Sequence, residues 1–339
     1  MFKSRYTLLL LVLLVLASCS KHEGRFVIEG TFRGFNQGEL YVYGVDGKRK
    51  LDTVGVNKGQ FEYRIPLEET ITLVIMFPNF SEIPVFAESG ADVKIEGDAN
   101  HLKEIQVKGT PLNEQMTTFR LQTSKMTPPE VIKAAETFIR ENPESPASRY
   151  ILDRYIIRVP EIDYKKAREL IEVIRKACPD DERLALLSTQ FEGLAAYNKP
   201  GSKLPAFTAT DLNGRRLTNA DLKAKVNVIT LWATWNHESM AIQNLLLRLQ
   251  GTYESDLKVV GVCLDADPRE CRRILANDSV QWSTVCDGQM WLSPILQKTG
   301  LCYLPDNILV DAQGKIIAHT LNYQQMTNKL RELLEKPSP

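Results

Sequence analysis

The stretch VNVITLWATWNHES, residues 226–239, decides how the C-terminal part of the chain folds. Residues 226–233 are almost all apolar, as is typical of a strand buried on both faces of a sheet. A second such run covers 257–264, and residues 238–253 between them have apolar side chains at helical spacing. We therefore expect a right-handed β-α-β unit inside an α/β domain over residues 203–336, in which strands alternate with helices.

Four short motifs in residues 203–336 resemble the TlpA/ResA branch of thioredoxin-like proteins. They are LPAF at 204–207, DLNG at 211–214, WATW at 232–235 and LP at 304–305. The resemblance implies a thioredoxin-like fold with a Trp-Cys-x-x-Cys motif directly after the first core strand. This chain reads WNHES at 235–239, so both family cysteines are replaced.

Asn236 and Ser239 occupy the positions of the two family cysteines, and neither can perform dithiol exchange. The first cysteine of such a site acts as a thiolate at a helix N-terminus, and the second resolves the mixed disulfide. Asn is a preferred N-cap residue, so we expect Asn236 to satisfy the amides of the helix instead. Catalysis by Ser239 with His237 is disfavoured because neighbouring helical positions do not face one another. No catalytic residue, metal site or cofactor is predicted here.

The resemblance also implies a groove that binds an extended peptide. The family proline that matches Pro305 is cis, and the residue before it, here Leu304, hydrogen-bonds the peptide. We expect Trp235, Asn236 and His237 to complete this groove, which needs no sulfur to recognise a main chain. The leading prediction is therefore a protein that binds a polypeptide or a small ligand.

The remaining cysteines leave an oxidoreductase open as the alternative. Cys302 lies three residues before Pro305, and Cys263 should approach Cys286 because residues 282–286 are expected to extend beside the second core strand. A redox protein of the TlpA/ResA type could use these three cysteines, whereas the simpler interpretation is a structural disulfide or buried thiols. The other two cysteines of the mature chain, Cys178 and Cys271, are interpreted as packing residues or exposed thiols. A purely structural envelope component is a third possibility.

Residues 1–18 are predicted to form a lipoprotein signal peptide. Two basic residues precede nine aliphatic residues at 8–16, which is less than half of the roughly 20 that a transmembrane helix needs. LASC at 16–19 resembles the bacterial lipobox, which implies that Cys19 is acylated and begins the mature chain. Ordinary secretory cleavage that leaves Cys19 as a thiol is the alternative.

Acylation of Cys19 would make residues 19–25 a lipidated tether, because two or three acyl chains anchor a protein stably to a membrane. We expect the protein in the bacterial cell envelope, most simply at the outer membrane facing the periplasm. The membrane and an envelope polypeptide are the expected partners. Such an oxidising compartment permits disulfides.

The first two thirds of the chain divide into two further blocks. Residues 26–110 alternate with period two between turn signals, which predicts an antiparallel all-β domain, a sandwich or an open barrel. This layout resembles the small all-β domain of unknown function that precedes thioredoxin-like domains in envelope lipoproteins. Residues 111–199 change to a helical period and predict an all-α subdomain, followed by the linker KPGSK at 199–203.

The composition is that of an ordinary globular protein. Hydrophobic residues make up 43% of the chain and charged residues 25%, which excludes a disordered or collagenous protein. Lys plus Arg and Asp plus Glu number 42 each, so the formal net charge is zero. Because the longest basic run is residues 48–50, nucleic acid is not an expected partner.

Overall fold

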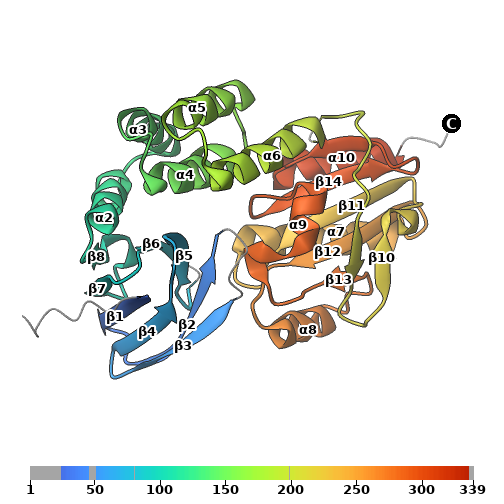
Figure 1. Cartoon of the computed structure of the whole chain (residues 1–339). Coiled ribbons are helices and arrows are strands. Elements are labelled where there is room, and N and C mark those ends of the chain that lie inside the picture. The colour runs from blue at the N-terminus through green and yellow to red at the C-terminus, as the bar shows by residue number, and fades with distance from the viewer. Residues whose placement is uncertain (1–23, 46–50, 80, 198, 336–339) are drawn as a thin grey trace, which may run out of the picture. The chain divides into compact units, whose positions relative to one another are not determined.

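The computed structural model describes residues 24–45, 51–79, 81–197 and 199–335 (Figure 1). The predicted signal peptide, Cys19 and most of the predicted tether lie outside the described residues. The chain forms two compact units, which divide between Thr127 and Pro128. None of the helices in the described residues combines the length and apolar character that a transmembrane span requires.

The first unit is built on one eight-stranded sheet with the order β6-β5-β2-β3-β4-β1-β7-β8. The strands are β1 (Arg25–Arg33), β2 (Gln37–Gly44), β3 (Asp52–Asn57), β4 (Gln60–Pro66), β5 (Ile71–Met76), β6 (Glu82–Ala87), β7 (Asp92–Asp98) and β8 (Gln106–Lys108). This confirms the predicted all-β region. Neighbouring strands run antiparallel except β1 and β7, which pair in parallel.

The sheet of the first unit curls around a single hydrophobic core. In β4 every second side chain is buried, as the period-two pattern of its sequence requires. Every strand contributes to one buried cluster. The rings of Phe32 in β1 and Phe77 just after β5 pack edge to face with their centroids 5.2 Å apart, although three strands separate β1 from β5 in the sheet. The arrangement is therefore closer to the expected open barrel than to a sandwich.

Helix α2 (Pro111–Thr123) belongs to this first unit. Asn113 accepts a hydrogen bond from the amide of Phe86 in β6 (2.9 Å) and donates one to its carbonyl (2.8 Å). Thr117 exchanges two hydrogen bonds of 3.1 Å with the main chain of Val107 in β8. Since β6 and β8 are the two edge strands, α2 covers both open edges of the sheet. The first compact unit therefore includes α2, which the sequence analysis groups with the helical subdomain from residue 111.

The second unit begins with the helical segment that the sequence predicts. It comprises α3 (Pro128–Glu141), α4 (Pro146–Leu152), α5 (Tyr164–Ala177) and α6 (Glu182–Tyr197). The side chains of Ser145 and Asp163 cap α4 and α5 by accepting hydrogen bonds from main-chain amides. The sequence predicts a single helix over 147–158, whereas the chain continues from α4 into a π-helical turn, Asp153–Ile157.

The C-terminal part of the second unit is a thioredoxin-like α/β domain, as predicted. Its five-stranded sheet has the order β13-β12-β11-β14-β15. β11, β12 and β13 are parallel, and β14 and β15 run antiparallel to their neighbours. The strands of this sheet are β11 (Val226–Trp232), β12 (Leu257–Cys263), β13 (Thr284–Val285), β14 (Asp306–Asp311) and β15 (Ile316–His319); a separate hairpin pairs β9 (Thr208–Thr210) with β10 (Arg216–Thr218).

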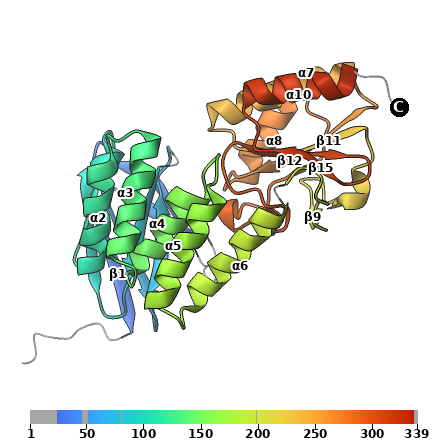
Figure 2. The same cartoon turned by 90° about the horizontal axis from the view of Figure 1, so that it is seen from above.

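Helices cover both faces of this sheet. They are α7 (His237–Thr252), α8 (Pro268–Asn277), α9 (Pro294–Thr299) and α10 (Tyr323–Glu335). α7 and α10 lie together on one face, and the hairpin strand β9 lies on the other (Figure 2). All seven residues of β11 are buried. Val228 packs towards α7 and α10, whereas Leu231 packs on the opposite face, so burial on both faces explains the apolar run.

Candidate functional site

Asn236 and Ser239, where the resemblance places the two family cysteines, form a helix cap at the end of β11. Asn236 is the N-cap of α7, and its side-chain oxygen accepts a hydrogen bond of 2.8 Å from the amide of Ser239. Ser239 is fully buried, and its hydroxyl lies 3.0 Å from the carbonyl of Ala233 and 2.9 Å from that of Asn236. The amide of Ser239, one of the amides at this terminus that would stabilise a thiolate, is therefore satisfied by the side-chain oxygen of Asn236.

Ser239 has none of the geometry of a catalytic serine. Its hydroxyl is inaccessible and also accepts a hydrogen bond of 3.2 Å from the amide of Ala233. In the described part of the chain no histidine hydrogen-bonds to it, and the side chain of His237 is exposed. A serine nucleophile needs a base within hydrogen-bond reach, so the site offers no serine-histidine chemistry.

The loop before β14 supplies the other side of the predicted groove. The Leu304–Pro305 peptide is cis, Pro305 is buried and Leu304 is half-buried. Neither the amide nor the carbonyl of Leu304 has a hydrogen-bond partner among the described residues. Burial raises the pKa of Tyr303, and the negative charge of Glu238 adds to this effect. Because Glu238 lies in the first turn of α7, this loop is close to that turn.

Asp306, directly after Pro305, stabilises this loop by accepting hydrogen bonds in its interior. It is fully buried, and its carboxylate accepts hydrogen bonds from the amide of Cys302 (3.0 Å), the amide of Asn307 (2.8 Å) and the hydroxyl of Thr320 (2.9 Å). Burial, reinforced by the negative charge of Asp306, raises the pKa of the Cys302 thiol. Cys302 is therefore a protonated thiol at neutral pH, which makes it a poor nucleophile.

A cluster of three cysteines lies at the end of the neighbouring strand. Cys263 ends β12, Cys286 directly follows β13, and Cys271 lies in the first half of α8. Their sulfur atoms lie within 4.8 Å of one another, and all three are free and buried. The sequence predicted that Cys263 and Cys286 approach each other, but it assigned Cys271 to ordinary packing or to the surface. Cys178 is the one cysteine among the described residues that is not fully buried.

The thiols of the cluster differ in their pKa values. Hydrogen bonds from Cys263 and Cys271 lower the pKa of Cys286 to about 4, whereas burial raises the pKa of Cys263 well above its usual value. A thiolate at Cys286 would be nucleophilic if a disulfide could reach it. With at most 7% of each residue exposed, the cluster in this conformation is closed to a protein substrate.

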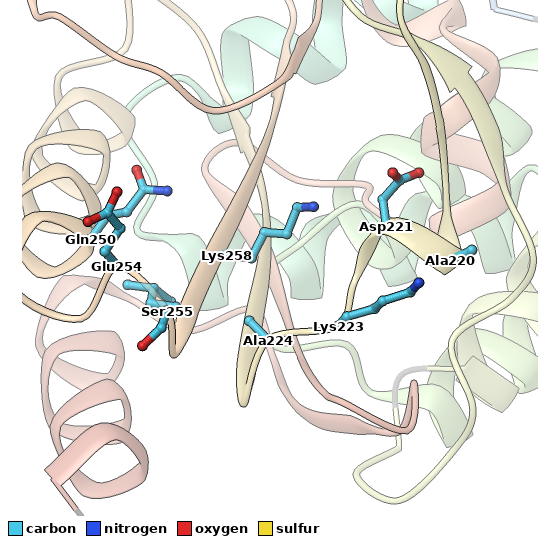
Figure 3. Close-up of a pocket in the computed structure, with 9 residues that line it drawn as sticks. Ala220, Asp221, Lys223, Ala224, Gln250, Glu254, Ser255 and Lys258 are labelled. Atoms are coloured by element: carbon cyan, nitrogen blue, oxygen red, sulfur yellow. The ribbon is translucent and has the colours of Figure 1, made fainter.

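A shallow pocket of about 440 Å³ lies elsewhere on the domain (Figure 3). It is found where β11 and β12 begin, at the end of the sheet opposite Asn236. Its charged side chains are two lysines, Lys223 and Lys258, and two carboxylates, Asp221 and Glu254, which balance in charge. Neither the predicted groove nor the cysteine cluster contributes to its lining.

Known proteins resemble the two ends of the chain separately. The family model described as "Domain of unknown function (DUF4369)" matches residues 26–116. The thiol-disulfide oxidoreductase ResA of Bacillus thuringiensis subsp. konkukian (strain 97-27) is 24% identical over 140 residues, which are 41% of this chain and 79% of that protein.

Two solved structures show the same partial coverage. A thiol-disulfide oxidoreductase from Bacteroides fragilis is 27% identical with a TM-score of 0.36, over 39% of this chain and all of that one. The thioredoxin domain of a thiol-disulfide oxidoreductase from Bacteroides vulgatus is 23% identical with a TM-score of 0.36, over 40% of this chain and 98% of that one.

The chain thus carries a thioredoxin-like domain that is homologous, at low identity, to thiol-disulfide oxidoreductases of the ResA type. At the positions where the resemblance places the two cysteines, the structure has a capping Asn236 and a buried Ser239.

Proposed function

We propose that this protein is a lipid-anchored component of the bacterial cell envelope whose thioredoxin-like domain binds an extended polypeptide segment without dithiol chemistry. The observation that carries the proposal is the main chain of Leu304, whose amide and carbonyl lack partners among the described residues and lie next to the buried Pro305. An extended segment can add to such an edge by main-chain hydrogen bonds. Trp235, half-buried beside Asn236, offers an aromatic surface for its side chains.

The cap at Asn236 supports binding rather than catalysis. Asn236 and Ser239 use their polar atoms on main-chain groups of their own loop. The groove therefore has no nucleophile, and a bound segment would leave by simple dissociation. Such binding is expected to be weak, with a dissociation constant on the order of micromolar.

A thiol trap tests the groove. In the full-length chain Asn236→Cys places one thiol at the terminus of α7. Its thiolate can attack a disulfide of a bound partner, which releases the partner's second sulfur as a thiol, and without a second thiol at 239 the mixed disulfide is not resolved. We expect this variant to capture defined envelope polypeptides, and the matched variant Asn328→Cys, on the exposed surface of α10, to capture none of them. Leu304→Pro, which removes the amide donor, should reduce the capture in a chain that still unfolds cooperatively. Equal capture by positions 236 and 328 would contradict the proposal.

Anchoring is tested separately. Mass spectrometry of the membrane fraction should find a mature chain that begins at acylated Cys19, and Cys19→Ala should release the protein or stall its export. An unmodified thiol at Cys19 in mature protein would refute the anchor without affecting the groove.

The alternative, an oxidoreductase that uses other cysteines, makes the opposite prediction for turnover. Cys263, Cys286 and Cys302 are all buried. We expect the full-length protein to reduce a disulfide substrate with dithiothreitol no faster than the uncatalysed reaction. A faster rate that disappears in Cys302→Ser or Cys286→Ser would establish the oxidoreductase.

A further inference from the structure

The three-cysteine cluster is assembled by the fold of the domain. β12 and β13 pair in parallel with Gly261 opposite Thr284 and Val262 opposite Val285, so the next residues in this register are Cys263 and Cys286. Helix α8 packs over this end of the sheet and adds Cys271, which is fully buried. Three thiols from three successive elements therefore meet at one point.

The geometry of the cluster is close to that of a metal site. The sulfur atoms lie within 4.8 Å of one another. In a tetrahedral site with Zn–S bonds of about 2.3 Å, the sulfurs are about 3.8 Å apart. Small side-chain movements would bring the three sulfurs to that spacing. An S–S bond of about 2.05 Å, by contrast, could join only two of them and would leave the third unexplained.

Asp265, two residues after Cys263, is buried next to the cluster, although its carboxylate is not part of the group of atoms that lie within 4.8 Å of one another. Asp265 is 4% exposed, and its main-chain oxygen is 3.6 Å from the sulfur of Cys286. One carboxylate oxygen accepts a hydrogen bond of 3.1 Å from the amide of Thr234, whereas the other is buried and has no hydrogen-bond partner in the described part of the chain. Buried polar oxygens are rarely left without a partner, so this one is available to a ligand.

The surroundings of the cluster are apolar. Trp232 and the half-buried side chains of Leu212, Met240, Ile274 and Leu275 pack around the three cysteines. The indole N–H of Trp232 also has no hydrogen-bond partner among the described residues. Such a shell excludes water and leaves a donor to support the charge of a sulfur ligand.

We propose that Cys263, Cys271 and Cys286 bind a single thiophilic d¹⁰ cation, Zn²⁺, through their three thiolates. On binding, the nearby carboxylate of Asp265 would turn towards the ion and become the fourth donor. Thiolates select soft and borderline ions over Mg²⁺ and Ca²⁺, and four protein ligands are typical of a closed, structural zinc site. Binding would replace the thiol protons by bonds to the metal without any change of oxidation state. The ion would hold α8 and the segment after β13 to the end of β12. This inference does not depend on the peptide groove.

Metal content and cobalt spectroscopy test the proposal in the full-length chain, purified with reductant and without chelator. We expect about one Zn²⁺ per chain, and Co²⁺ in its place should give sulfur-to-cobalt charge-transfer bands and the visible spectrum of a tetrahedral site. Added Zn²⁺ should raise the melting temperature of the metal-free reduced protein, because it binds only the folded state.

Serine variants assign the ligands. Cys263→Ser, Cys271→Ser and Cys286→Ser should each abolish the charge-transfer bands or shift them to fewer sulfur ligands. Cys302→Ser is the matched control, since Cys302 is equally buried in the same domain but outside the cluster. Asp265→Asn should weaken binding by about 10–100-fold while keeping the sulfur bands.

The measurements on the wild-type chain do not depend on whether a serine variant folds. A reduced, folded chain that holds no stoichiometric Zn²⁺ and whose melting temperature does not respond to Zn²⁺ would overturn the proposal. So would a native chain in which two of the three cysteines prove to be joined in a disulfide.

Discussion

At the scale of single residues, Asn236 and Ser239 give the N-terminus of α7 a side-chain cap. A thiolate at such a terminus is stabilised by the unpaired amides and the helix dipole. In this chain Asn236 accepts a hydrogen bond from the amide of Ser239, and the Ser239 hydroxyl bonds back to Ala233 and Asn236. The terminus is therefore stabilised at all times, whereas a thiolate would stabilise it only in its reduced form.

The cap predicts a stability effect. Asn236→Ala should lower the free energy of unfolding by about 0.5–2 kcal/mol, because the amide of Ser239 loses its acceptor. Asn236→Ser, which restores an acceptor, should recover most of this loss. Urea denaturation of the two variants measures the difference, and Asn328→Ala on the exposed face of α10 is the control. A cost for Asn236→Ala no larger than that of the control would mean that the cap contributes nothing.

The same terminus predicts a gain of activity. Asn236→Cys combined with Ser239→Cys places two thiols at a helix N-terminus beside the cis Leu304–Pro305 loop. We expect this double variant to reduce a disulfide substrate with dithiothreitol faster than the wild-type chain does, since the first thiol gains the amides that lower its pKa. Asn236→Cys alone should form mixed disulfides but not turn over. A folded double variant without activity would show that the groove no longer admits a disulfide.

At the scale of elements, the regular parts of the fold follow from sequence pattern and the short parts do not. The sequence pattern predicts helices over 268–277 and 323–335, which are the observed bounds of α8 and α10, and the apolar runs mark β11 and β12. Within residues 26–110 the alternation predicts six strands, over 26–32, 39–44, 60–65, 70–77, 83–87 and 92–97. It misses β3 and β8, because Gly55 weakens the pattern of β3 and β8 has only three residues. Their positions are fixed by pairing with neighbouring strands rather than by their own composition.

The candidate site likewise has one part that the sequence predicts and one part that it does not. The cap at Asn236 and the loop at Pro305 are predictable, because each depends on a motif in consecutive residues. The role of Cys271 is not, because the spacing of residues 263, 271 and 286 matches no metal-ligand motif. The three sulfurs meet through the pairing of β12 with β13 and the packing of α8, which a local pattern does not contain.

Between α3 and α5 an ion pair makes stability depend on pH. Glu136 lies 2.8 Å from Lys166 and 2.9 Å from Arg140, and hydrogen bonds from these cations lower its pKa. A carboxyl whose pKa is lower in the folded state stabilises the fold above its unfolded pKa, and this contribution is lost as the pH falls through the folded pKa. Glu136→Gln should therefore cost about 0.5–1 kcal/mol at neutral pH and almost nothing at an acid pH below the folded pKa of Glu136.

Chemical denaturation at the two pH values measures this difference. Glu144→Gln is the control, since Glu144 is exposed and forms no ion pair within the described ranges. A cost for Glu136→Gln that is the same at both pH values would assign its effect to packing instead of charge.

At the scale of the whole molecule, the boundary between the two units does not fall where the sequence changes from strands to helices. It falls after α2, because this helix supplies the hydrogen bonds that the two edge strands β6 and β8 lack. The family model for the all-β region likewise extends to residue 116, inside α2. A helix can thus belong to a β domain when its side chains cover open strand edges.

This boundary predicts how the chain can be cut. A fragment of residues 24–127 should unfold cooperatively, whereas a fragment of residues 24–110, which ends where the sequence pattern changes, should lose cooperativity or aggregate through its two exposed edges.

Within the longer fragment, Asn113→Ala should lower the free energy of unfolding by about 1–3 kcal/mol because it leaves the amide and carbonyl of Phe86 buried without partners. Thr118→Ala, on the exposed side of α2, should cost much less. Urea unfolding followed by circular dichroism compares these chains. If the fragment of residues 24–110 proves as stable as the longer one, α2 does not stabilise the sheet, and the boundary belongs between residues 110 and 111, as the sequence pattern indicates.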